Sequence, residues 1–200
     1  MSERVMDILR GCDALLEGHF RYTSGRHGAV YFEKIRIAGR PDLAMELGRL
    51  TADLWRDEPP NLVCAPAYGA IVFGFAAAYH LGLPFAFLQR DGNGRMAARP
   101  GFMPLLEGAG VLLVEDVVTT GGSVMESIAA LESAGASVKG VSLLVDRTGG
   151  AFNPGVPCRS LLQVTAESWP AEDCPLCRKG IPLSIPGSSG KRTDSRQDVD

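Results

Sequence analysis

The sequence lacks the features that would place the chain in a membrane or on a secretory route. Its 200 residues contain no apolar run near the roughly 20 residues that a membrane helix needs. The N-terminal stretch MSERVMDILRGCDALL carries charges throughout and has no signal-peptide core. Cysteine is scarce and odd in number, with five scattered residues, so no disulfide framework is expected. We therefore expect a cytoplasmic protein without a membrane partner.

An excess of basic charge is also missing. The formal net charge is −3, with 20 lysines and arginines against 23 aspartates and glutamates. A nucleic-acid-binding face usually carries a clear positive excess, so no nucleic-acid partner is expected. With 46% hydrophobic and 22% charged residues, the composition is typical of a globular enzyme with one sizeable core.

One stretch, VLLVEDVVTTGGSV, joins a buried strand to an acidic pair and a loop of glycines and hydroxyls before a helix. No Gly-Lys-Ser/Thr follows its glycines, which excludes a P-loop, and no G-x-G-x-x-G opens the helix, which excludes a dinucleotide fingerprint. The loop still suits a phosphate, because glycines permit positive φ and amides at a helix N-terminus hold anions. The acidic pair, Glu115 and Asp116, could hold Mg²⁺ or accept hydrogen bonds from sugar hydroxyls.

Strands and helices alternate along the chain, which predicts an α/β fold with a mostly parallel central sheet flanked by helices. We expect strands at 61–66, 84–90, 109–118, 138–147 and 159–164, helices at 3–17, 41–55, 71–82 and 123–135, and two short β segments within 19–39. The segment DGNGRMAARPGF at 91–102 has no periodicity and is expected to be a loop. Residues 1–184 should form a single domain, and the polar residues 185–200 a disordered tail.

The acidic-pair stretch resembles the phosphoribosyl diphosphate motif of type I phosphoribosyltransferases. Three further segments resemble the orotate phosphoribosyltransferases of that family, namely HFRYTSGRHGAVYFEK, VCAPAYGAIVFG and LLVDR. The resemblance covers nearly the whole folded chain. It implies the type I phosphoribosyltransferase fold, with a small N-terminal hood formed by about residues 1–40 and the C-terminal part. It also implies transfer of a 5-phosphoribosyl group from phosphoribosyl diphosphate to orotate, in UMP biosynthesis, by a Mg²⁺-using homodimer.

The resemblance assigns roles in binding the phosphoribosyl donor. Glu115 and Asp116 contact the ribose hydroxyls directly or through Mg²⁺, which is otherwise bound mainly through the substrate. The cradle for the 5-phosphate comprises Thr119, Thr120, Gly121, Gly122 and Ser123. The backbone of Ala67, Tyr68 and Gly69 holds the pyrophosphate, in some relatives through a cis peptide. A flexible loop at 90–102, acting across the dimer interface, offers Arg90, Arg95 and Arg99.

The acceptor is assigned from other residues. Arg147 suits the orotate carboxylate because a guanidinium fork matches a carboxylate, although a surface salt bridge is the alternative. Tyr31 and Phe32 either face the orotate ring or are core aromatics. Two other functions stay open: phosphoribosyl transfer to a purine or another base, and a non-catalytic regulator that senses phosphoribosyl diphosphate.

The sequence departs from the best-known orotate pattern by its shortage of lysine. Gly69 follows Tyr68 and Thr23 precedes the Ser-Gly turn where relatives have lysines, and the 90–102 loop lacks the usual lysine and histidine. A lysine-poor subgroup of the family shares these departures and the CPLC motif. Lys34, the only lysine before residue 139, is interpreted as a solvated strand residue. The lone CPLC motif is interpreted as a structural turn, because zinc needs about four ligands and only Cys158 is a plausible third.

Overall fold

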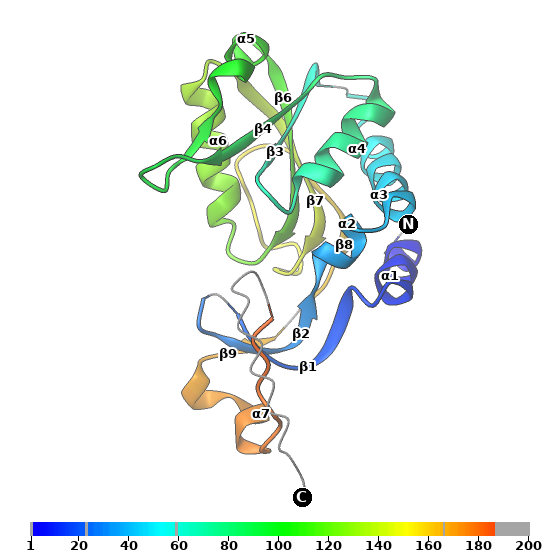
Figure 1. The fold of residues 1–200 in the computed structure, drawn as a ribbon, viewed down its shortest axis with the longest axis vertical. Helices are drawn as coiled ribbons and strands as arrows, with labels where there is room; N and C mark the ends of the chain where they lie inside the picture. The colour runs from blue at the N-terminus through cyan, green and yellow to red at the C-terminus, as the bar shows by residue number, and fades with distance from the viewer. Residues whose placement is uncertain (1, 23, 59, 166, 187–200) are drawn as a thin grey trace, which may run out of the picture.

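The computed structural model describes residues 2–186 except 23, 59 and 166 (Figure 1). The body is built on a six-stranded sheet in the order β5-β4-β3-β6-β7-β8. Its strands are β3 (Leu62–Pro66), β4 (Phe85–Arg90), β5 (Met96–Ala98), β6 (Gly110–Val118), β7 (Ser137–Asp146) and β8 (Cys158–Gln163). All neighbours pair in parallel except β5, which pairs antiparallel with β4. The expected α/β fold with a mostly parallel sheet is thus confirmed.

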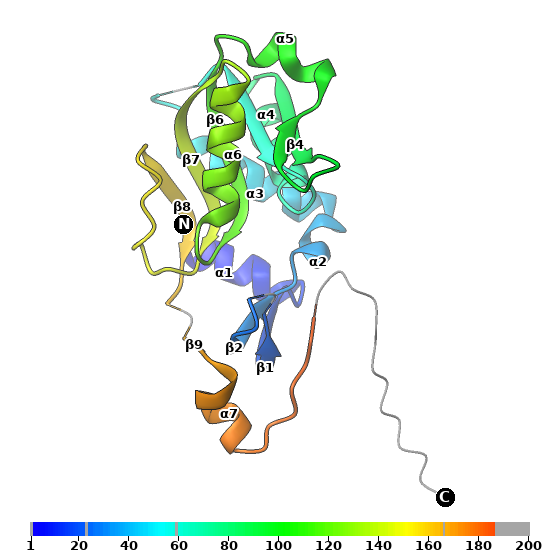
Figure 2. The ribbon, with the colours of Figure 1, turned by 90° about the vertical axis from the view of Figure 1, so that its left-hand side faces the viewer.

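Helices cover both faces of this sheet (Figure 2). They are α1 (Ser2–Gly11), α3 (Pro41–Asp53) and α4 (Ile71–Leu81) on one face, and α5 (Met103–Leu106) and α6 (Gly122–Ser133) on the other. Successive β6 residues alternate between them: Leu112 and Val114 pack in the cluster of α1, α3 and α4, and Val111 and Leu113 in that of α5 and α6. Burial of both faces explains the continuous apolar runs of the strands. No described helix is both long and apolar enough to cross a bilayer.

A small antiparallel sheet lies beyond one edge of the body, at the lower end in Figure 1. Its strands are β1 (Leu15–Arg21), β2 (His27–Phe32) and β9 (Ser168–Trp169), in the order β1-β2-β9. A 3₁₀ turn (Ala171–Asp173) and the short α7 (Pro175–Arg178) follow β9. We call these three strands, together with residues 170–186, the hood. The short helix α2 (Lys34–Ala38) leads from β2 into the body.

Three of the expected elements are wrong in part. The helix expected at 3–17 ends at Gly11, because the chain turns through Asp13, with φ of 52°, and enters β1 at Leu15. The β segment expected to continue to residue 39 stops at Phe32 and is followed by α2. The expected loop at 91–102 contains β5 and a 3₁₀ turn (Pro100–Phe102), because β4 offers a free edge for antiparallel pairing. Thr23 and most of the expected tail, residues 187–200, lie outside the described residues.

Candidate active site

The polar residues noted in the sequence lie at the edge of the sheet where the parallel strands end. In open α/β sheets this edge binds ligands, since the loops that follow the strands converge there. The hood lies beyond the same edge (Figure 1). Two side-chain contacts described below, one through α2 and one through Tyr22, connect the hood side to the strand ends. The candidate site is therefore built by the body and the hood together.

Glu115 is buried near the end of β6, with 6% of its surface exposed. Its Oε1 accepts a hydrogen bond of 3.0 Å from the amide of Asp116, and its Oε2 accepts one of 3.0 Å from the Ser123 hydroxyl. Burial, together with the neighbouring charge of Asp116, raises the pKa of Glu115 to about 7. The carboxyl group therefore changes charge near neutral pH and is fixed to the first residues of α6.

Asp116 forms an ion pair with a lysine that comes from the hood side. Its Oδ2 lies 2.6 Å from Lys34 Nζ, and its Oδ1 accepts a hydrogen bond of 2.6 Å from the amide of Val117. Oδ2 accepts no hydrogen bond from any other described group. Burial acts to lower the pKa of Lys34, but the attraction of Asp116 outweighs it and the pKa is raised. The interpretation of Lys34 as a solvated strand residue is thus wrong: it opens α2 and pairs with a buried carboxylate.

Gly69 leaves the space that this ion pair occupies. A Cβ atom at position 69 would lie 1.9 Å from Asp116 Oδ2 and 2.7 Å from Lys34 Nζ. The loop that carries it begins with a cis peptide between Ala67 and Tyr68, and the Tyr68 side chain is 87% exposed. Relatives were expected to have a lysine at the position of Gly69. Here the ammonium group of Lys34, from another part of the chain, lies beside Gly69 instead. The resemblance gave no role to this lysine, although its rarity in the sequence was a signal.

The hydroxyl-glycine loop leads directly into the N-terminus of α6. Gly121 has a φ of 83°, and a Cβ atom there would lie 2.0 Å from the Phe152 ring, so glycine is required for both reasons. Thr119, Thr120 and the first two residues of α6 are exposed. The loop therefore presents hydroxyls and helix-terminal amides to solvent, which is the arrangement that binds an anion.

Arg147 follows β7 and lies against a tyrosine of the hood. Its Nη2 donates a hydrogen bond of 2.6 Å to the Tyr22 hydroxyl, and its Cζ lies 4.4 Å from the centre of the Tyr22 ring. The same hydroxyl donates a 2.6 Å hydrogen bond to the carbonyl of Val30. Arg147 Nε is buried and has no hydrogen-bond partner among the described residues. Tyr22 thus orients the guanidinium through its ring and its hydroxyl, and this role of Tyr22 was not anticipated from the sequence.

The two aromatic residues of β2 have different surroundings. Phe32 is 7% exposed and packs in the core cluster of α1, α3 and α4. Tyr31 is half-buried, and burial followed by the charge of Glu33 raises the pKa of its hydroxyl. Tyr31 is therefore the member of the pair that remains accessible beside the acidic pair.

The three arginines of the 90–102 segment stay on the surface. Arg90, at the end of β4, pairs with Glu126 of α6 at 2.8 Å, and Arg95 lies 3.5 Å from Asp91. Arg95 and Arg99 are exposed, and neither makes a hydrogen bond or ion pair with the acidic pair or the hydroxyl-glycine loop in the described part of the chain. Within this single chain, Arg95 and Arg99 thus do not contact the acidic pair or the hydroxyl-glycine loop, and Arg90 at the end of β4 pairs with α6 instead.

Comparison with known proteins gives a consistent result. Residues 36–173 match the phosphoribosyl transferase domain family. The chain is 40% identical to the orotate phosphoribosyltransferase of Desulforamulus reducens, over 93% of this chain and 96% of that protein. It is 41% identical to the orotate phosphoribosyltransferase of Thermus thermophilus, over 90% of this chain and 97% of that protein. The solved orotate phosphoribosyltransferase of Aeropyrum pernix matches with a TM-score of 0.64 at 29% identity, covering 80% of this chain and 93% of that one.

Proposed function

The chain belongs to the orotate phosphoribosyltransferases of the phosphoribosyl transferase family, and on this basis we propose that it converts orotate and phosphoribosyl diphosphate to orotidine 5-monophosphate and pyrophosphate. One observation carries the proposal: an acidic pair, an anion-binding loop and the guanidinium of Arg147 are associated with the ends of adjacent parallel strands, β6 and β7. The reaction is a step of UMP biosynthesis. It requires no protein nucleophile, since a ring nitrogen of orotate attacks C1 of the ribose as pyrophosphate leaves.

The donor is held by β6 and the residues after it. The amides and hydroxyls of Thr119, Thr120, Gly121, Gly122 and Ser123 receive the 5-phosphate, which the N-terminal end of α6 favours electrostatically. Asp116 and Glu115 accept hydrogen bonds from the ribose hydroxyls. Lys34 pairs with Asp116 and supplies a positive charge beside the loop of Ala67, Tyr68 and Gly69, where the pyrophosphate binds. These contacts position C1 and stabilise the positive charge that develops on the ribose.

Mg²⁺ fits this site as an ion bound mainly through the substrate. Carboxylate oxygens are the ligands that Mg²⁺ prefers, and Glu115 and Asp116 supply them. Their oxygens are already engaged, however, by Lys34, by Ser123 and by two backbone amides. A cage made of protein groups alone is therefore not built here, and substrate oxygens complete the coordination. When bound, Mg²⁺ neutralises the charge of the pyrophosphate.

The acceptor is recognised by Arg147. Its guanidinium is oriented by Tyr22, over whose ring it lies and to whose hydroxyl it donates, and a guanidinium fork suits the carboxylate of orotate. Tyr31 flanks the ring of orotate, with Phe32 behind it in the core. A neutral purine offers no carboxylate to this guanidinium, so Arg147 favours orotate over a purine.

We extend the proposal to a homodimer that shares its active sites. Phe75 and Tyr79, one turn apart on α4, are 58% and 68% exposed, and Tyr68 nearby in sequence is 87% exposed. Such aromatic residues favour a second copy of the chain as the partner. Arg90, Arg95 and Arg99 of the 90–102 segment then serve the partner's site, where they neutralise pyrophosphate and exclude water.

We also propose how far the catalytic domain extends along the chain and that the protein is cytoplasmic. Residues 1–184 form one catalytic domain, with residues 1–40 and the C-terminal part supplying the hood. All five cysteines are unpaired, which is consistent with the reducing environment of the cytoplasm.

The direct test is a spectrophotometric assay of orotate consumption with and without phosphoribosyl diphosphate, in Mg²⁺ or Mn²⁺. Adenine, guanine, hypoxanthine and uracil are supplied in parallel with the same donor. We expect turnover with orotate in the presence of phosphoribosyl diphosphate and none with the other four bases. Turnover with a purine and none with orotate would assign another acceptor. Binding of the donor without turnover on any base would support the regulator.

A further inference from the structure

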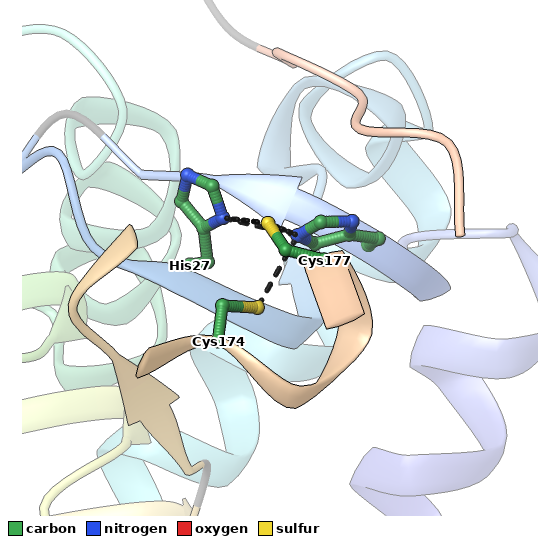
Figure 3. Close-up of side chains that lie close together, drawn as sticks. His27, Cys174 and Cys177 are labelled. Atoms are coloured by element: carbon green, nitrogen blue, oxygen red, sulfur yellow. Dashed lines mark hydrogen bonds between the residues drawn. The ribbon is translucent and has the colours of Figure 1, made fainter. Parts of the chain in front are cut away.

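The hood contains four side chains that converge on one point and that the proposed reaction does not use. They are His19 of β1, His27 of β2, Cys174 and Cys177, and one ligand atom of each lies within 4.8 Å of all the others. Figure 3 shows the side chains of Cys174, Cys177 and His27 pointing toward one another between the β1–β2 hairpin and the turn that carries the CPLC motif. We propose that these four residues bind one structural zinc ion.

The distances between the ligand atoms fit a tetrahedral ion. Zinc bonds of about 2.3 Å to sulfur and about 2.0–2.1 Å to nitrogen put neighbouring ligand atoms about 3.3–3.8 Å apart. His19 Nε2 lies 3.0 Å from His27 Nδ1, 3.4 Å from Cys174 Sγ and 3.7 Å from Cys177 Sγ. Cys177 Sγ lies 3.3 Å from His27 Nδ1. These four distances lie within a few tenths of an ångström of the tetrahedral values, and the two remaining pairs of ligand atoms are within 4.8 Å.

A hydrogen-bonded cluster without metal accounts poorly for this geometry. The Nδ1 of His19 lies 2.8 Å from the carbonyl of Ile181, a bond in which the nitrogen is the donor. Nε2 of the neutral ring then carries one lone pair, yet three possible donors surround it. One cation at the centre satisfies all four groups. The Ile181 carbonyl then plays the part of the outer hydrogen-bond partner that orients a metal-bound histidine.

The ligand set is also that of a closed structural site. His19 is 2%, His27 5% and Cys174 0% exposed, and only Cys177 reaches the surface. Two histidines and two cysteines complete the tetrahedron, which leaves no open position for a substrate or water. The ion therefore acts on the fold and takes no part in bond making.

The site compensates for the small core of the hood. Among the described residues, neither hydrophobic cluster of the body includes one from 165 to 186. In the described part of the chain, the backbone of this C-terminal segment pairs with the hairpin at few points: His27 with Trp169, Gly28 with Ser168, and Ser184 beside Phe20. Small structural units of this kind commonly depend on a metal for stability. Zinc would fasten the last part of the chain to the β1–β2 hairpin.

The sequence did not indicate this site, because its histidines lie far from its cysteines along the chain: Cys174 follows His19 by 155 residues and Cys177 follows His27 by 150. The CPLC spacing gave two ligands, and Cys158 was considered as the third. Cys158 instead begins β8, in the body of the protein. The two histidines join the cysteines because the β1–β2 hairpin lies against α7.

The test measures metal in the purified protein by inductively coupled plasma mass spectrometry. We expect about one zinc per chain after removal of loosely bound metal. Cys174→Ser, Cys177→Ser and His19→Ala should each lose nearly all of it, and the matched control Cys158→Ser should keep it. Wild-type protein stripped by a chelator and refilled with Co²⁺ should show the visible bands of tetrahedral cobalt with thiolate ligands, a result that does not depend on the folding of any variant.

Hydrogen exchange of the hood gives a second measurement, which distinguishes a zinc site from a Cys174–Cys177 disulfide. Stripping zinc should accelerate hydrogen exchange in residues 168–181 by about tenfold or more, and zinc should restore it. The proposal is overturned if wild-type protein holds no zinc and gives no cobalt spectrum, or if zinc content is unchanged in the cysteine variants. It is equally overturned if mass spectrometry finds a Cys174–Cys177 disulfide in metal-free protein and an oxidant, in place of zinc, restores protection.

A consequence for activity rests on the proposed function and fails separately from the metal measurement. His19 and His27 flank the turn that carries Tyr22, the contact of Arg147. Loss of zinc should therefore raise the KM for orotate more than the KM for phosphoribosyl diphosphate. If the native protein contains zinc but its loss changes the two KM values equally, the metal site is supported and its role in positioning Tyr22 is refuted.

Discussion

Lys34 Nζ lies 2.6 Å from Asp116 Oδ2. This ion pair joins α2, which leads from the hood into the body, to the end of β6. The aspartate is buried and the lysine side chain is 41% exposed. Without Lys34, the buried carboxylate of Asp116 would lie beside Glu115 with no counter-charge among the described side chains.

Replacing Lys34 should therefore weaken both stability and donor binding. We expect Lys34→Met to lower the free energy of unfolding by about 1–2 kcal/mol, less than for a fully buried pair because solvent screens the exposed lysine. The KM for phosphoribosyl diphosphate should rise by about tenfold, since one positive charge near the pyrophosphate is lost. Urea unfolding and steady-state kinetics measure the two effects. Lys139→Met, at an exposed lysine on β7, is the control, and identical behaviour of the two variants would contradict the prediction.

Arg147→Lys should impair orotate binding selectively. Lysine keeps the charge but loses the planar fork, so we expect the KM for orotate to rise by about 10–100-fold with little change for phosphoribosyl diphosphate. Tyr22→Phe, which removes only the hydroxyl, should cause a smaller change in the same direction. Arg159 offers a matched control, because its Cζ also lies over an aromatic ring, 4.3 Å from the centre of Trp55, but at the start of β8. Equal effects of Arg147→Lys and Arg159→Lys on orotate would refute the assignment.

Glu115 should make stability depend on pH. Its pKa is about 7 in the folded protein and near 4.5 when exposed, so between these values the folded state holds a proton that the unfolded state has lost. The free energy of unfolding should thus fall as pH rises from about 4.5 to 7, and Glu115→Gln should remove up to about 3 kcal/mol of this fall. Urea unfolding at a series of pH values checks it, with the exposed Glu132→Gln as control. Parallel pH profiles of wild type and Glu115→Gln would show that folding does not change the pKa of this carboxyl and would contradict the prediction.

The aromatic face of α4 should hold the dimer together. Phe75→Glu should give a monomer in light scattering and a large loss of activity, because Arg95 and Arg99 then have no partner site to complete. Met125→Glu, on α6, where the methionine is 46% exposed, should leave the dimer intact.

A mixing experiment tests whether the sites are shared. Arg95→Ala/Arg99→Ala protein and Arg147→Ala protein should each be weakly active, and exchange of their subunits should restore part of the activity. No recovery after confirmed exchange would mean that the arginines act within their own chain.

The central part of the fold could be predicted because local pattern and tertiary environment agree there. The strand ending at Val118 and the helix that starts at Gly122 both follow from periodicity and from the glycines between them. At the N-terminus the two disagree: Leu15 and Leu16 continue the helical spacing of α1 but pair with Phe32 and Tyr31 in the hood. A distant partner decided between helix and strand, and one sequence window does not contain that partner.

The missed site residues share this cause. Lys34 lies in a helix of five residues, too short for a periodic signal. Tyr22 is notable only because Arg147, 125 residues later, lies against it. The cradle after Asp116, by contrast, is continuous in sequence, so its motif could be recognised directly.

The pairing of β2 with β9 gives the protein an order of assembly during synthesis. His27 is made well before Trp169, so these two strands can meet only after the residues of the central sheet have been synthesised. The parallel strands from β3 to β7 can pair sooner, and long-range contacts such as β2 with β9 form more slowly. We therefore expect the nascent protein to carry a folded sheet and a hood without its third strand until β9 has left the ribosome. Catalytic competence would then be acquired only after the last strand is released.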